Sequence, residues 1–218
     1  MQRHPRVYII FWGPKWSSSS TRSVVRAAVV NTIKAMRGSS YQHILTQYYD
    51  RAGQVTGDVR LAGVWRDRTK PRGDLTASNR GVRRAAREIA HAVAVKRWHN
   101  SLNAQYLLLI DSPEPTGYCA RNANRSLRGA VFVFSIVPWL GPRGIGCGGN
   151  SLAEAYGSTV SHEYAEMVTD PLANAWARGS PAGHNNEIAD LCSSRPDARV
   201  RGVWMQKIWS NRLHRCAA

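Results

Sequence analysis

The sequence predicts a single α/β (or α+β) domain built on a mixed sheet. Short apolar runs typical of buried strands alternate along the chain with longer segments of helical periodicity. There is no internal repeat and no clear domain boundary in the 218 residues. We therefore expect one domain over residues 1–218, with the sheet and helices in 1–150 and a long helix, a loop and a C-terminal strand in 151–218.

The N-terminal half predicts strands and helices in turn. Val7–Trp12 is a continuous apolar run before Gly-Pro, which indicates a buried strand and a turn. Apolar residues at helical spacing predict helices over Ser23–Met36 and Asn79–Trp98, and a helical continuation over Tyr41–Tyr49. Gln54–Trp65 alternates polar and apolar residues and predicts a strand or hairpin before a charged loop at 67–74.

The C-terminal half predicts further strands, a glycine-rich loop and a long helix. Strands are expected over Gln105–Ile110, Val131–Val137 and Val200–Trp209, and loops over 141–150 and 179–186. Ser151 and Glu154 have the spacing of a capping box, so a helix should begin there and end near Thr169, before Pro171.

The net charge of +16 comes mainly from arginine, since 25 of the 30 basic residues are Arg. Such an excess can mark a nucleic-acid partner. The arginines are scattered, however, which favours a solvated basic surface, so nucleic acid is not the expected partner. The sequence gives no indication of the oligomeric state.

Four cysteines indicate the compartment. No C-x-x-C pair is present, so a zinc knuckle is not expected, and an even number of widely spaced cysteines suits two disulfides in an exported protein. Three pairings remain open among Cys119, Cys147, Cys192 and Cys216. No apolar segment is long enough to span a membrane, and Val7–Trp12 is too short for a signal peptide.

Acidic residues cluster around the predicted long helix. Five of the 14 lie between Glu163 and Asp190, an unusual density in a basic protein. His162 and Glu166 are one helical turn apart and share a face, so both can reach one cation. Glu163 then occupies the general-base position of an H-E-x-x-H-like helix and is the expected catalytic residue that activates a metal-bound water.

The remaining ligands are expected downstream. Metalloproteases of the thermolysin type place a third-ligand Glu after a helix and loop, followed by an Asp that orients the first His. By that resemblance Glu187 is the third ligand and Asp190 orients His162. Asp170 and His184 are competing ligands. Zinc is the expected ion, and the extra carboxylate makes calcium, manganese or iron alternatives.

The chain also resembles the Exordium, or phosphate-induced, family and its bacterial relatives. The shared motifs are V-Y-I-I-F-W-G-P-K-W at 7–16, T-G-Y-C at 116–119, S-H-E-Y-A-E-M-V-T-D-P-L-A-N-A-W at 161–176, E-I-A-D-L-C at 187–192 and I-W-S-N-R-L-H-R-C at 208–216. This resemblance implies secretion, and it supplies no established reaction.

Together these features predict a zincin-like domain and an exported metal-dependent hydrolase, most simply a zinc peptidase acting on a peptide. The alternative is a non-catalytic secreted protein that binds cell-wall polymer or a partner, with a structural metal or none.

Overall fold

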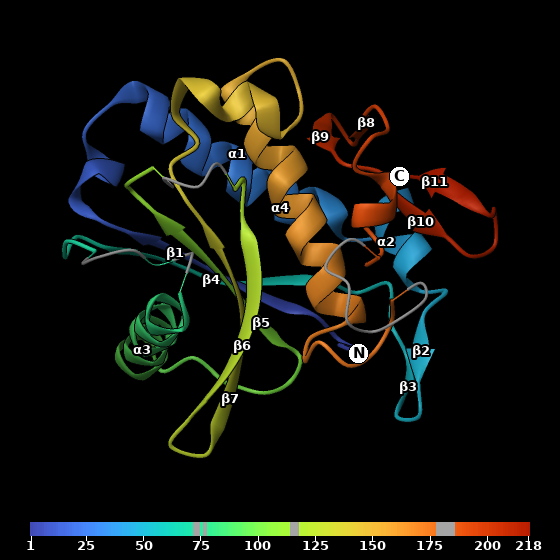
Figure 1. Cartoon of the computed structure of the whole chain (residues 1–218), viewed down its shortest axis with the longest axis horizontal. Helices are drawn as coiled ribbons and strands as arrows, with labels where there is room; N and C mark the ends of the chain where they lie inside the picture. The colour runs from blue at the N-terminus through green and yellow to red at the C-terminus, as the bar shows by residue number, and fades with distance from the viewer. Residues whose placement is uncertain (72–74, 76–77, 114–117, 178–185) are drawn as a thin grey trace.

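The centre of the molecule is a mixed sheet (Figure 1). The computed structural model describes residues 1–71, 75, 78–113, 118–177 and 186–218, and this part contains a five-stranded sheet of order β4-β1-β5-β7-β6. Its strands are β1 (Arg6–Trp12), β4 (Arg60–Asp67), β5 (Ala104–Ile110), β6 (Arg121–Leu127) and β7 (Ala130–Val137). The first three and β7 are parallel, whereas β6 runs antiparallel to β7 at one edge. The predicted α/β class is confirmed.

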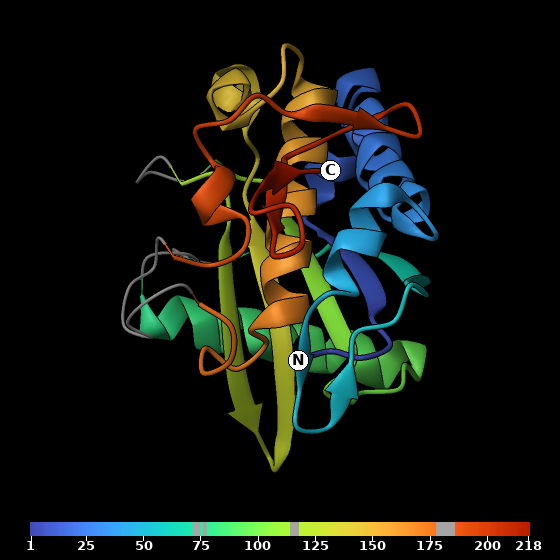
Figure 2. The same ribbon diagram turned by 90° about the vertical axis from the view of Figure 1, so that its right-hand side faces the viewer.

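Helices cover both faces of the sheet (Figures 1 and 2). On one face lie α1 (Ser20–Met36) and α4 (Leu152–Thr169), and on the other lies α3 (Asn79–Lys96). Strand β1 contributes alternate side chains to two cores: Ile9 packs on the α1 and α4 side, and Ile10 packs on the α3 side. Because β1 is buried on both faces, its sequence is a continuous apolar run.

Helix α4 occupies the middle of the molecule. The Ser151 side chain accepts a hydrogen bond from the Glu154 backbone N–H, which confirms the predicted capping start. The helix ends at Thr169, just before Asp170 and Pro171, as expected. Nearly all of its residues are buried, because the sheet packs on one side and the C-terminal part of the chain packs on the other (Figure 2).

The C-terminal part consists of short elements. They are the 3-10 helix η3 (Asp190–Cys192) and the strands β8 (Ala198–Val200), β9 (Val203–Met205), β10 (Ile208–Ser210) and β11 (Arg215–Ala217). Of these, β9 packs on α4. Short elements bury little apolar surface, and the Cys192–Cys216 disulfide, which joins η3 to β11, supplements them. Cys119 pairs with Cys147 and Cys192 pairs with Cys216, which confirms two disulfides and settles the pairing.

The remaining elements connect these parts. They are α2 (Ser40–Leu45), the hairpin of β2 (Tyr49–Asp50) and β3 (Gly53–Gln54), and the 3-10 helices η1 (Pro14–Ser17) and η2 (Gly141–Cys147). None of the helices in the described part of the chain is long and apolar enough to cross a membrane.

Several element boundaries differ from the prediction. The expected strand over 200–209 is divided among the end of β8, β9 and β10, and the helical continuation over 41–49 stops at Leu45. The region 54–65 contains the end of a hairpin and the start of β4, and η2 lies in the expected loop at 141–150. Strand β6 was not predicted, because its sequence R-N-A-N-R-S-L lacks an apolar run. The loop expected at 179–186 lies, apart from residue 186, outside the described residues.

Candidate metal centre

His162 and Glu166 lie side by side on α4. Helical geometry brings side chains at i and i+4 onto one face, and here His162 Nε2 is 2.9 Å from Glu166 Oε1. Glu166 is only 4% exposed. A buried carboxylate needs a counter-charge, so this pair favours either a protonated imidazole or a bound cation.

Asp190 completes a group of three potential ligands. It is the first residue of η3, and its Oδ1 lies 3.5 Å from His162 Nε2. One ligand atom from each of His162, Glu166 and Asp190 lies within 4.8 Å of the other two. One nitrogen and two carboxylate oxygens form a ligand set that suits zinc and other divalent first-row ions. One cation between these three side chains would neutralise both carboxylates.

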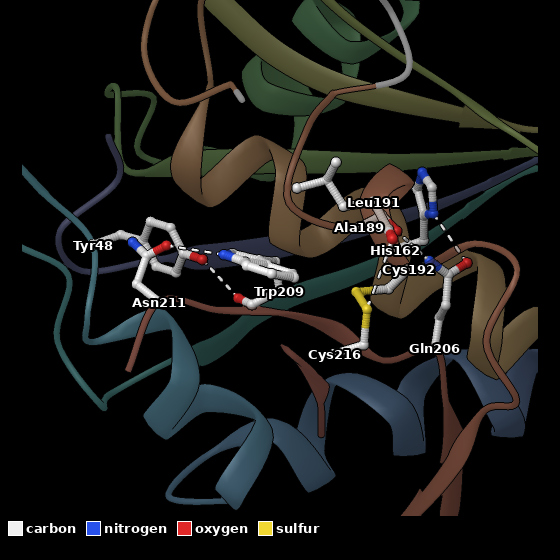
Figure 3. The surroundings of a disulfide bond; sticks show 9 residues. All are labelled: Tyr48, His162, Ala189, Leu191, Cys192, Gln206, Trp209, Asn211 and Cys216. Carbon is white, nitrogen blue, oxygen red and sulfur yellow. Dashed lines mark hydrogen bonds between the residues drawn. A yellow bond between two sulfur atoms is a disulfide. The ribbon is translucent and has the colours of Figure 1, made fainter. Parts of the chain in front are cut away.

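Gln206 orients the imidazole from the other side (Figure 3). Its Oε1 lies 3.1 Å from His162 Nδ1, and its Nε2 donates to the Ala189 carbonyl at 2.8 Å. The Ala189 carbonyl accepts only, so Nε2 is the amide end that faces it and Oε1 is the end that faces His162. Nδ1 must then carry a proton, which leaves Nε2 as the atom that can bind a metal.

Gln206 also joins the two segments that carry the ligands. Its backbone N–H donates to Ser161 Oγ at 2.9 Å, beside His162 on α4, while its side chain holds Ala189, beside Asp190. The Trp209 backbone N–H donates to the Ile188 carbonyl at 3.0 Å. These bonds fix the segment 188–190 against α4 in the region drawn in Figure 3.

Glu166 is held from the sheet. Asn122 of β6 donates from Nδ2 to Glu166 Oε2 at 2.9 Å, and Ser135 of β7 donates to Asn122 Oδ1 at 2.5 Å. The second oxygen of Glu166 is thereby directed towards His162. Sequence reasoning did not identify Asn122, Ser135 or Gln206, because amides and hydroxyls far along the chain carry no spacing signal.

Glu163 is buried beside this group, with 5% exposure. Burial raises the pKa of Glu163 to about 8, although the nearby His162 opposes the shift. Its Oε2 has no hydrogen-bond partner among the described residues. A buried carboxylate with a raised pKa and a free oxygen is suited to accept and return a proton.

Two cavities meet at His162 and Glu163. The first, here called the acidic cavity, is about 720 Å³ and lies between β6 and the segment that contains Glu187 and Asp190. The second, here called the disulfide cavity, is about 690 Å³ and is bordered by the Cys119–Cys147 disulfide and by Trp204. Both volumes are in the range of ligand-binding clefts.

The charges in the group influence one another strongly. Burial alone would lower the pKa of His162, but the carboxylates of Glu166, Glu163 and Asp190 raise it to about 10. Burial and the neighbouring carboxylates raise the pKa of Glu187 to about 8. In this arrangement the imidazolium takes the place that a divalent cation would take.

The predicted site residues within the described part of the chain lie in one region, but the third member of the ligand group is Asp190 and not Glu187. Asp190 lies in the three-residue group, whereas Glu187, the predicted third ligand, lines the acidic cavity outside it. Asp170 lines the same cavity, and its Oδ1 accepts backbone N–H bonds from Asn174 and Ala175 at 2.7 Å each. His184 lies outside the described residues.

A scan against protein-family models and searches of curated proteins and of solved structures find no match to this chain. The site must therefore be interpreted from its own residues, and the Exordium resemblance rests on the sequence motifs alone.

Proposed function

We propose that this protein is an exported, zincin-like, metal-dependent hydrolase, with peptides as the expected substrates. The observation that carries the proposal is the convergence of His162, Glu166 and Asp190 from two separate segments, with Glu163 buried next to them. Zinc is the expected ion. Such an ion supplies Lewis acidity to a reacting carbonyl group.

The chain's own residues account for the remaining steps. Glu163 accepts a proton from the attacking water and returns it to the leaving amine, which its raised pKa favours. Gln206 keeps Nε2 of His162 directed at the ion. Asn122 keeps Glu166 in place.

The edge of the sheet supports an extended peptide as substrate. Strand β6 has no neighbouring strand on its outer side within the described residues, and Arg121, Asn122 and Asn124 of β6 line the acidic cavity. A peptide in extended conformation can pair with such an edge and pass over Glu163. This placement brings a scissile amide close to the candidate base.

Export is consistent with the covalent structure. Two disulfides indicate an oxidising environment. Secretion itself is part of the proposal, supported by the Exordium-like motifs.

Metal content and hydrolysis test the proposal together. Wild type, His162→Ala and Glu163→Gln would be purified without chelating resin and measured by elemental mass spectrometry, with the exposed His214→Ala as control. About one zinc per chain is expected in all except His162→Ala, and peptide cleavage in wild type and the control only. No stoichiometric metal in the wild type would refute the proposal.

A second candidate is favoured by the many carboxylates near the group. Calcium prefers about six to eight oxygen ligands. Glu163, Glu187 and Asp170 lie in the same cavity as the three-residue group. Stoichiometric calcium together with no cleavage would instead support a non-catalytic exported protein that binds cell-wall polymer or a partner through a structural metal.

A further inference from the structure

The acidic cavity holds more carboxyl groups than one metal ion can bind. Five of the 14 acidic residues of the chain line it. His162, Glu166 and Asp190 could hold one divalent cation, which would engage two of these carboxyl groups. The other three are Glu163, Asp170 and Glu187, and Arg121 is the only Arg or Lys among the described lining residues.

A second metal ion does not account for this surplus. Within the described residues, a single group of three ligands lies close enough together to hold an ion, and neither Asp170 nor Glu187 belongs to it. Asp170 is instead anchored at the end of α4 by two backbone N–H groups. The surplus carboxylates are therefore spread along the cavity wall.

Two other observations indicate an organic ligand. Glu163 is 5% exposed, lines the cavity, and has an oxygen without a hydrogen-bond partner among the described residues. Tyr118 lines the same cavity and is 61% exposed, so most of its ring is available to a ligand. An aromatic ring can cover the apolar stem of a Lys or Arg side chain and attract its charge.

The two cavities differ in the number of carboxyl groups that line them. Among the described residues, Asp197 and Glu163 are the carboxylates that line the disulfide cavity, and Arg195 lines it as well. A substrate that crosses Glu163 thus meets two carboxyl groups and one Arg on one side, and five carboxyl groups and one Arg on the other. In a protein of net charge +16, the acidic cavity is a local exception.

We propose that the acidic cavity binds a Lys or Arg side chain of the peptide substrate next to the cleaved bond, with Glu187 and Asp170 as the residues that select it. This inference rests on the proposed function. A cationic head would pair with the carboxyl groups outside the metal group and favour their ionised form. The cavity of about 720 Å³ can hold a long side chain beside the peptide backbone.

Matched peptides test this selectivity on the zinc-loaded, full-length protein. Peptides that differ only by Lys, norleucine or Glu would be compared, with the variable residue placed on either side of the cleaved bond. The kcat/KM for Lys should exceed that for norleucine about tenfold or more at one position, and Glu should be worst. Equal values for Lys and norleucine at every position would overturn the inference.

Two variants assign the effect to residues. Glu187→Gln and Asp170→Asn should each reduce the Lys-to-norleucine ratio several-fold, and the ratio cancels any loss common to both peptides. Asp58→Asn, far from the site and paired with Arg37, is the control and should leave the ratio unchanged. If Glu187→Gln instead abolishes zinc content, Glu187 is a metal ligand and its assignment here is wrong.

Binding without catalysis separates this inference from the proposed function. Agmatine, which carries a guanidinium on an apolar stem, would be titrated into isotope-labelled protein and followed by NMR. Shifts at Tyr118 that Glu187→Gln weakens support the cation site even if no hydrolysis is ever found. Hydrolysis of peptides without any response to agmatine and without Lys preference would leave the proposed function standing and refute the cation site.

Discussion

A single amide side chain decides which nitrogen of His162 faces the acidic cavity. Gln206 meets Nδ1 at 3.1 Å and the Ala189 carbonyl at 2.8 Å, so it both sets the tautomer and joins α4 to the segment before Asp190. Loss of a group that orients a metal-binding histidine commonly lowers metal affinity by roughly 10- to 100-fold. The structure thereby identifies a residue that motif reasoning did not consider.

Gln206→Met tests this role. Methionine has a similar length and makes neither hydrogen bond, so zinc affinity should fall about 10- to 100-fold. Gln206→Glu keeps an acceptor for Nδ1–H and should lose less affinity. Competition with a chromophoric chelator measures both, and Gln54→Met on the β2–β3 hairpin, outside the site, is the control. Unchanged affinity in Gln206→Met would show that the tautomer is set elsewhere.

A second carboxyl pair lies far from the site, between β4 and α3. Glu88 is partly buried and hydrogen-bonds to Asp67, and burial followed by the effect of Asp67 raises the pKa of Glu88 to about 8. Asp67 itself is buried, and although burial acts to raise its pKa, hydrogen bonds from Thr69 and Glu88 lower it. The pair therefore shares one proton near neutral pH.

This proton makes stability depend on pH. The pKa of Glu88 is higher in the folded state than in the unfolded chain, so its contribution is fully present below about pH 4.5 and is lost as the pH rises through about 8. Glu88→Gln removes this loss. The free energy of unfolding of the variant, relative to that of the wild type, should therefore rise by about 1–2 kcal/mol between pH 5 and 9, after allowance for solvent screening. Urea unfolding across that range measures it. A constant difference would contradict the shifted pKa.

At the scale of elements, the sequence predicted what depends on local pattern. The apolar runs of β1, β5 and β7 and the capping box of α4 all appear as expected, because burial on both faces and helix capping leave clear local signals. Strand β6 did not, because a polar edge strand is fixed by its partner β7 and not by its own residues. The same reason explains why Asn122 was missed.

Helix α4 shows how closely these elements pack. A Cβ added at Gly157 would lie 2.3 Å from the Trp204 carbonyl oxygen of β9, an approach that only glycine permits. Since α4 carries His162, this close approach also fixes how near the helix lies to β9. The sequence could place Gly157 in the helix but could not show which backbone it meets.

Gly157→Ala should therefore destabilise the protein even though alanine favours helices. The steric overlap should cost about 1–3 kcal/mol, more than the gain in helix propensity of roughly 1 kcal/mol. Gly57→Ala is the matched control, since an added Cβ there meets nothing within 4 Å. Chemical denaturation compares the two. A Gly157→Ala protein as stable as the wild type would show that β9 can move away from α4.

At the scale of the whole molecule, the metal group is assembled from distant parts of the chain. The ligands come from α4 and η3, and their supports come from β6, β7 and the turn after β9. Sequence analysis found His162, Glu163, Glu166, Glu187 and Asp190 because they cluster along the chain. It could not tell which of Asp190 and Glu187 faces His162, because the two residues are only three positions apart in the chain. Their places in the fold are set by the hydrogen bonds of this segment to Gln206 and Trp209.

The two disulfides provide the sharpest comparison at this scale, since they close loops of similar length, with separations of 28 and 24 residues. Replacing either pair by serine should cost about 2–4 kcal/mol of stability.

Only Cys192 lies next to a ligand, two residues after Asp190, so Cys192→Ser with Cys216→Ser should also loosen the ligand segment and weaken zinc binding about tenfold or more. Cys119→Ser with Cys147→Ser, which borders the disulfide cavity, should lose comparable stability with much less change in zinc affinity. Thermal unfolding and chelator competition on both double variants separate the two effects. Equal losses of zinc affinity would mean that the disulfides act on the site only through global stability, and that Gln206 and Trp209 alone position Asp190.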